Sequence, residues 1–260
     1  MEGLTVLSLA GVLLCAASFL AGLIDAISGG GGLISLPTFM AVGFPAHYIM
    51  GTSQCSTIPG CVIALIQFAL KKKIHWPSAI ICIPACMVGA FLGARLNIIT
   101  PEHILRIIMI VLVPIVAVVV LSKHDIGAEN RVDTLSPKRL VITNILIGLI
   151  LGTYQGFYGA GSGTFLLLAF ALADRLDLVT ASGNVKAVVT FSSVVATATY
   201  VAEGLIAWDF VVAITIFNAA GAFFGARLAL TKGAKVIRPM FIAVLTILFL
   251  SVAVELITNP

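Results

Sequence analysis

The sequence predicts an all-α polytopic membrane protein made of two inverted repeats, with glycine-broken half-helices near the bilayer midplane. Three observations predict this fold class. Of 260 residues, 60% are hydrophobic and 10% are charged, with a mean hydropathy of +1.15, whereas soluble domains carry about 25% charged residues. Long apolar runs recur along the whole chain, and two glycine clusters lie 130 residues apart. We therefore expect a multi-pass protein surrounded by membrane lipid.

The apolar runs define the expected elements in chain order. A spanning helix needs about 20 apolar residues, and runs close to that length occupy residues 4–27, 46–70, 77–97, 104–122, 140–158, 178–202, 207–230 and 236–257. Two shorter apolar segments occupy 33–42 and 164–173 and can form only half a crossing as helices. We expect a first membrane repeat at 1–122, a cytoplasmic linker at 123–139 and a second membrane repeat at 140–260.

A glycine cluster precedes each short segment. The first is Ser28-Gly29-Gly30-Gly31-Gly32, and the second is Gly159-Ala160-Gly161-Ser162-Gly163. Clustered glycines interrupt helices. Because lipid cannot satisfy the freed backbone groups, such breaks are tolerated only where they are buried in protein or line a cavity.

The match between the halves extends beyond the glycines and indicates an internal duplication. At an offset of 130, the segment Gly51–Gln54 falls on Ala181–Asn184, which makes Ser56 the partner of Lys186. Two residues are then inserted. At an offset of 132, GAFLGARL (89–96) matches GAFFGARL (221–228) at seven of eight positions. The Gly-x-x-x-Gly spacing in both octads predicts close helix packing.

Basic residues indicate that the repeats are inverted, because such residues collect in cytoplasmic loops. An inverted arrangement puts Lys71–Lys73, the linker and the Arg227–Arg238 loop on one side and leaves only Arg95 and Arg106 on the other. A parallel arrangement would put six basic residues outside. We expect both termini to face outward from a prokaryotic inner membrane.

The broken helices predict a binding site for a small anion. A helix that restarts after a break directs free N–H groups and a positive dipole end toward it. Two such breaks in inverted repeats are typical of secondary transporters, and glycine lets backbone approach a ligand closely. The expected substrate-binding residues are Gly29, Gly30, Gly31, Gly32, Thr52, Ser53, Gln54, Gly159, Gly161, Ser162, Gly163, Ser182, Gly183, Asn184 and Lys186.

Two charged residues stand out within the apolar runs. Lys186 lies in the otherwise uncharged stretch Thr180–Tyr200, and a charge at membrane depth is a functional candidate by default. It would attract the anion, unless it reaches the membrane interface or pairs with Asp25. Asp25, just before the first glycine cluster, is a candidate for proton coupling, a partner for Lys186, or a carboxylate in water at a helix end.

Other functional classes find no support in the sequence. There is no His-Glu-x-x-His motif, no ATP-binding glycine loop ending in lysine, and no Ser–His pair for an intramembrane protease. We therefore expect no enzyme activity, no catalytic residues, no cofactor and no metal site. A basic patch with interleaved aromatics is also missing, so nucleic-acid binding is not expected.

The paired motifs resemble the TauE/SafE sulfite exporter (TSUP) family. They are GLIDAISGGGGLISLP (22–37) followed by Gly51-Thr52-Ser53, and GTYQGFYGAGSG (152–163) followed by Ala181–Asn184. The resemblance covers essentially the whole chain. It implies a secondary transporter, often an exporter, of small sulfur-containing anions such as sulfite or organosulfonates. The second copy departs from the glycine run at Ala160 and Ser162.

The sequence supports alternating access as the mechanism, with the repeats rocking around a site between them. Two alternatives share the same sequence features. A passive anion channel would show no acceleration of flux by substrate on the opposite side. A membrane chaperone or partner subunit would have no solute site, and its glycine clusters would tolerate alanine. The identity of the anion, the coupling ion and the oligomeric state are open at this stage.

Overall fold

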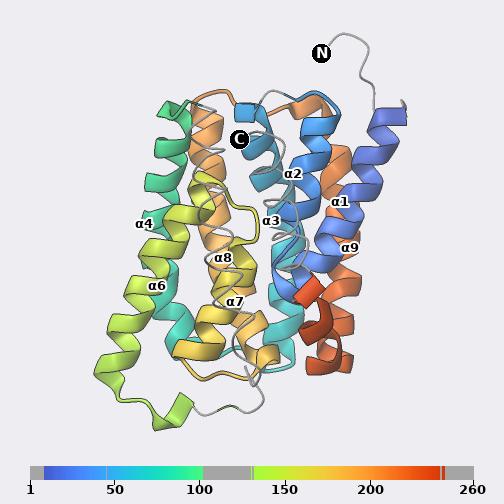
Figure 1. Ribbon diagram of the computed structural model, residues 1–260. Coiled ribbons are helices and arrows are strands. Elements are labelled where there is room, and N and C mark those ends of the chain that lie inside the picture. The colour runs from blue at the N-terminus through green and yellow to red at the C-terminus, as the bar shows by residue number, and fades with distance from the viewer. Residues whose placement is uncertain (1–8, 45, 102–129, 131, 241, 244–260) are drawn as a thin grey trace, which may run out of the picture.

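Figure 1 is a computed structural model, and the structure describes residues 9–44, 46–101, 130, 132–240 and 242–243. Within these residues every regular element is helical, which confirms the predicted all-α class. Six helices are long and apolar enough to cross a membrane. They are α1 (Leu9–Ser28), α3 (Ala46–Leu70), α4 (Trp76–Ile99), α6 (Pro137–Phe157), α8 (Leu178–Ala202) and α9 (Trp208–Lys232). The expected span 104–122 and most of 236–257 lie outside the described residues.

Three shorter helices lie between or before these spans, and residues 234–240 and 242–243 after α9 are also helical. The half-helices α2 (Gly32–Ala41) and α7 (Ser162–Ala173) follow the two glycine clusters, as the apolar pattern predicts. A single 3₁₀ turn, η1 (Val132–Thr134), precedes α6. Since α2 and α7 have 10 and 12 residues, each rises only about 15–18 Å, half the thickness of a bilayer core.

Polar capping residues fix where several helices begin. The Ser136 hydroxyl accepts a hydrogen bond from the backbone N–H of Arg139, and Pro137 occupies the first turn of α6. Asp177 caps α8 by accepting from the backbone N–H groups of Val179 and Thr180 at 3.0 and 3.1 Å. Such caps satisfy amides that have no partner within the helix.

Glycines hold the helix pairs α1–α9 and α4–α6 together. A Cβ atom on Gly221 would lie 1.9 Å from the carbonyl oxygen of Phe19 on α1. One on Gly93 of α4 would lie 2.0 Å from the carbonyl oxygen of Thr153 on α6. Only glycine permits these distances, so the predicted packing role of the two Gly-x-x-x-Gly octads is confirmed.

The order of these contacts gives the helix directions. Gly221 and Gly225 of α9 meet Phe19 and Leu23 of α1 in the same order along both helices, so α1 and α9 run parallel. The same reasoning makes α4 parallel to α6, whereas α3 and α8 pack antiparallel. As Figure 1 shows, α1 descends from the N-terminal end and α6 ascends from the opposite end.

The structure corrects the position of the two-residue insertion between the halves. Gly51 packs on the carbonyl of Leu205, and Gly183 packs in the same way on the carbonyl of Lys73. Gly51 therefore corresponds to Gly183, an offset of 132, and the extra residues lie within α7, two residues longer than α2. The partner of Lys186 in the first half is consequently Gln54. The offset of 130 predicted from the sequence pairs it with Ser56, and that prediction is wrong.

Candidate functional site

A cavity of about 50 Å³ lies where the two helix breaks meet. This volume is enough for a few water molecules or one small polyatomic ion. Both halves line it, with contributions from all the spanning helices except α4. Its polar and glycine lining comprises Asp25, Gly29, Gly31, Gly32, Ser35, Ser53, Gln54, Thr57, Gln155, Tyr158, Gly159, Ser162, Gly163, Ser193 and Asn218.

Backbone conformation explains why glycine occupies the breaks. Gly29, Gly159 and Gly161 have φ angles of +79°, +74° and +72°, a region that other residues adopt only at a cost. The two breaks also touch each other, because a Cβ atom on Gly29 would lie 2.2 Å from the carbonyl carbon of Gly163. Their glycines thus allow both the turn and the close contact.

Three serine hydroxyls in the cavity are available to a ligand. Ser35 on α2, Ser53 on α3 and Ser162 at the start of α7 line the cavity. Their hydroxyls form no hydrogen bond to any residue within the described ranges. The neighbouring hydroxyl of Thr57 differs, since it donates to the carbonyl of Ser53 at 2.8 Å. The serines can therefore donate to a solute in the cavity.

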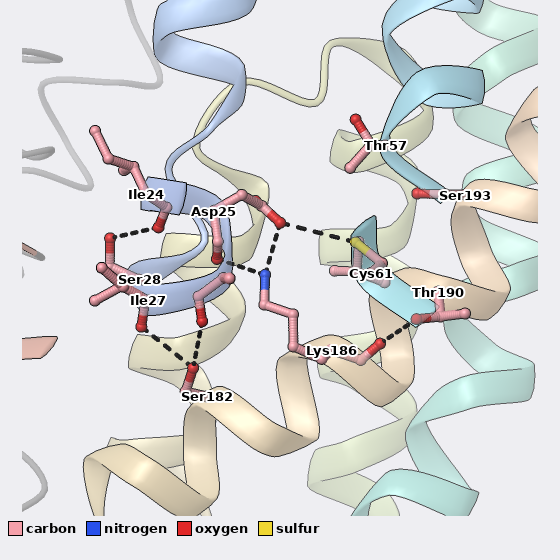
Figure 2. Close-up of polar contacts among 12 residues, drawn as sticks. Ile24, Asp25, Ile27, Ser28, Thr57, Cys61, Ser182, Lys186, Thr190 and Ser193 are labelled. Carbon is pink, nitrogen blue, oxygen red and sulfur yellow. Dashed lines mark hydrogen bonds and ion pairs between the residues drawn. The ribbon is translucent and has the colours of Figure 1, made fainter. Parts of the chain in front are cut away.

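An ion pair lies at one side of the cavity (Figure 2). The Lys186 ammonium contacts the Asp25 carboxylate at 2.7 Å and donates to the Asp25 carbonyl at 2.5 Å. The Cys61 thiol lies 3.8 Å from the same carboxylate oxygen. The Lys186 side chain is 1% exposed and that of Asp25 is 17% exposed. Asp25 thus lines the cavity, and the Lys186 ammonium lies behind it.

A neutral network makes the equivalent contact between α3, α6 and α8. The Gln54 side-chain amide donates to the Gln155 carbonyl at 3.1 Å. The Ser193 hydroxyl donates to the Gln54 side-chain oxygen and accepts from the Gln155 amide, both at 3.0 Å. These three side chains correspond to Lys186, Asp25 and Cys61 of the ion pair cluster.

Several residues expected to bind substrate lie outside the cavity lining. Thr52 accepts a hydrogen bond from the backbone N–H of Ala207, and Asn184 bonds the backbone of His75. Ser182 donates to backbone carbonyls at the end of α1, and Gly183 packs on Lys73. These four residues contact the backbone of loops and helix ends around the site and thereby stabilise its surroundings. Gly30, Gly161 and Lys186 also lie outside the lining set.

Conversely, Tyr158 at the end of α6 and five polar lining residues within helices were not predicted from the sequence to bind substrate. The five helical residues are Ser35, Thr57, Gln155, Ser193 and Asn218. Each is a polar residue within an apolar helix, and that signal alone could have suggested them. Within the described residues no group of His, Cys, Asp or Glu side chains is arranged to hold a metal ion.

Comparison with known proteins agrees with this architecture. The sulfite exporter TauE/SafE family model matches residues 14–252. A "probable membrane transporter protein ORF9" of Sinorhizobium sp is 30% identical over 94% of this chain and 91% of the relative. The YfcA "probable membrane transporter protein" of Escherichia coli K12 is 30% identical over 87% and 83%. A Haemophilus influenzae relative with the same description is 28% identical over 91% of both chains.

No solved structure gives a significant match. The family match nevertheless spans nearly the whole chain and includes both glycine breaks, both half-helices, five of the six candidate spans in full and the first from residue 14 onward. The chain is an integral multi-pass membrane protein, and it belongs to the sulfite exporter TauE/SafE family of membrane transporters.

Proposed function

We propose that this transporter exports small sulfur-containing anions, such as sulfite or organosulfonates, by alternating access. The observation that carries the proposal is the cavity between the two breaks, lined by the hydroxyls of Ser35, Ser53 and Ser162, which have no hydrogen-bond partner among the described residues. A ligand there would touch both halves at once. Movement of one half relative to the other would then open the site to each side of the membrane in turn.

The surroundings of the cavity favour an anion. The first residues of α2 and α7, Gly32 and Ser162, line it, so the positive ends of both helix dipoles lie beside the ligand. Serine hydroxyls are donors suited to oxyanion oxygens. The family description as a sulfite exporter supports a sulfur oxyanion over other anions of similar size.

The proposal includes inverted repeats in a bacterial inner membrane, with both termini outward. Opposite directions of α1 and α6 support the inversion. Basic residues gather at one end of the molecule: the Lys71–Lys73 turn, Arg175, which donates to Thr134, and Lys232 at the end of α9. This end would face the cytoplasm.

Ligand-induced stabilisation of purified protein tests the binding site. We expect sulfite or an organosulfonate to raise the melting temperature, because a ligand at 100-fold excess over its Kd stabilises by about 2.7 kcal/mol. Ser53→Ala should weaken binding about tenfold or more, since a hydrogen bond to a charged group contributes about 1.5–3 kcal/mol. Ser56→Ala is the matched control, because its hydroxyl donates to the Ser53 carbonyl and lies outside the lining set.

Flux in proteoliposomes separates the alternative functions. A carrier accelerates uptake of labelled substrate when unlabelled substrate is preloaded inside, whereas a passive channel does not. A partner or chaperone subunit without a solute site would give neither flux nor ligand-induced stabilisation. Equal loss of binding in Ser53→Ala and Ser56→Ala would contradict the proposed site.

A further inference from the structure

The same contact between the two halves occurs twice beside the cavity, with different chemistry. In one copy, the Lys186 ammonium of α8 donates to the backbone carbonyl of Asp25, near the end of α1. In the other copy, the Gln54 amide of α3 donates to the backbone carbonyl of Gln155, near the end of α6. The equivalence of Gly51 with Gly183 makes Gln54 the counterpart of Lys186, and the aligned glycines Gly29 and Gly159 pair Asp25 with Gln155.

The hydrogen bond to the backbone carbonyl forms with either a lysine or a glutamine, so the charge of Lys186 has a purpose other than this bond. A neutral amide is sufficient to bond the last carbonyls of α6, so packing alone does not require a lysine at the equivalent position. A buried ion pair carries a desolvation cost that a glutamine pair avoids. Intramembrane charges are therefore expected to serve transport rather than stability.

The arrangement of the pair determines what an entering anion meets first. The Asp25 carboxylate lines the cavity, whereas Lys186 is 1% exposed and lies behind it. With Asp25 ionised, the pair is neutral and presents its negative member to the cavity. With Asp25 protonated, the ammonium becomes an uncompensated positive charge close to the bound solute.

We propose that Asp25 takes up one proton each time the cavity binds a monovalent anion, and that this proton frees the Lys186 ammonium to bind the anion. The proton adds to a carboxylate oxygen, Lys186 keeps its own protons, and no other bond forms. The inference rests on the proposed function. Anion and proton favour each other's binding, because either alone leaves an unbalanced charge in a buried site. Transport of a monovalent anion would then be electroneutral.

The side chains around Asp25 favour a proton over a metal cation as the coupling ion. Among the residues that the structure describes, the titratable groups that face it are Lys186 from α8 and Cys61 from α3, with Tyr158 at the end of α6 also lining the cavity. The half-helices α2 and α7 contain no titratable residue, and α9 contributes the neutral Asn218, while its Arg227 is exposed. A metal cation at Asp25 would be repelled by the adjacent ammonium.

Calorimetric binding of methanesulfonate tests the inference, since this sulfonate keeps a single charge across the working pH range. Titrations of purified protein in buffers of different ionisation enthalpy count the protons taken up. We expect one proton per anion, and an affinity that falls about tenfold per pH unit on the alkaline side. Asp25→Asn should bind the anion with no proton uptake and no pH dependence. Asp174→Asn, which replaces a buried carboxylate outside the cavity, should keep the wild-type anion affinity and proton uptake.

A double variant keeps the test decisive if Asp25→Asn does not fold. Asp25→Gln with Lys186→Gln copies the amide contact that Gln54 and Gln155 already make, so we expect it to melt near the wild-type temperature. It should lose methanesulfonate binding at least tenfold. Wild-type affinity in the double variant, or anion binding by wild type without proton uptake, would overturn the inference and leave the proposed function standing. Failure of wild type to bind or transport any sulfur anion would instead refute the proposed function.

Discussion

The contact between Gly29 and Gly163 joins the two helix breaks at the level of single residues. Gly29 has a φ angle of +79°, and a Cβ atom there would lie 2.2 Å from the carbonyl carbon of Gly163. Gly43 has a similar φ of +89°, but a Cβ atom there would meet nothing within 4 Å. The two positions therefore separate backbone strain from close contact.

We predict that Gly29→Ala destabilises the protein much more than Gly43→Ala. Gly43→Ala should cost about 1–2 kcal/mol for the left-handed conformation alone. Gly29→Ala adds a clash between the new Cβ atom and the Gly163 backbone, which should cost about 1–3 kcal/mol more. It should also abolish transport, because the clash forces apart the two helix breaks that form the binding site. Thermal unfolding in detergent and flux in proteoliposomes measure the two effects. Similar losses in both variants would contradict the contact.

Asp174, between α7 and α8, is a buried carboxylate outside the spanning helices. It accepts hydrogen bonds from the Asn144 amide at 3.1 and 2.9 Å, and Ser78 bonds it as well. Burial raises the pKa of the Asp174 carboxyl above its ordinary 3.8, and the bonds from Ser78 and Asn144 and the nearby His75 only partly oppose this. The folded state therefore favours the neutral acid.

We predict that Asp174 makes the protein less stable as pH rises. Below pH 3.8 the carboxyl is neutral in both states, so its contribution is complete there. As pH rises through the higher folded-state pKa, folding must bury an anion and the contribution is lost. The melting temperature of Asp174→Asn relative to wild type should thus rise with pH. A difference in melting temperature between Asp174→Asn and wild type that does not change with pH would refute the prediction.

Residue-level roles were the hardest to predict from the sequence. Ser182 and Asn184 look like ligand donors because they lie in a polar segment near a break, but their side chains bond backbone groups of α1 and His75. The distinction depends on which way each side chain faces in the packed bundle. Sequence spacing does not show which way these side chains face. The two-residue error in the register between the halves also pairs each of them with the wrong residue of the first half.

At the scale of helices, the parallel pairs α1–α9 and α4–α6 depend on glycine. A Cβ atom on Gly221 would lie 1.9 Å from the Phe19 carbonyl oxygen, and one on Gly89 would lie 2.6 Å from that of Leu149. These two glycines are equivalent in the repeats. Each lies where two helix backbones touch.

We predict that Gly221→Ala and Gly89→Ala destabilise the protein to a similar extent. Overpacking at each interface should cost about 1–3 kcal/mol, or a fall of about 2–4 °C per kcal/mol in melting temperature. Val212→Ala on α9 is the control, because Val212 is 67% exposed and makes no such backbone contact. A fall in Val212→Ala as large as in the glycine variants would argue against backbone contact as the cause.

Helix positions could be predicted well because membrane thickness fixes their length. The apolar runs 46–70 and 178–202 coincide with α3 and α8, and both half-helices begin within two residues of the expected position. The two-residue insertion could not be located, because small polar residues around Gly51 and Gly183 match at either offset. The packing of these glycines on Leu205 and Lys73, and the equivalent hydrogen bonds of Thr52 with Ala207 and of Asn184 with His75, identify the correct register.

At the scale of the whole molecule, its two ends differ in charge. The turn Lys71–Lys73 lies at the same end as the start of α6, which carries Lys138 and Arg139 (Figure 1). At the opposite end, Arg95 pairs with Glu203 at 2.7 Å, so its charge is compensated. Uncompensated basic residues at one end favour a single orientation in the membrane.

We predict that cysteines introduced at Lys71 and Lys138 are cytoplasmic and that one at Glu203 is external. In intact cells lacking an outer-membrane barrier, an impermeant maleimide should label Glu203→Cys and leave Lys71→Cys and Lys138→Cys unmodified until the membrane is opened. All three positions are exposed, so access depends on the side of the membrane. The control replaces the five native cysteines with serine and should remain unlabelled. External labelling of Lys71→Cys would reverse the orientation, and with it the expected direction of export.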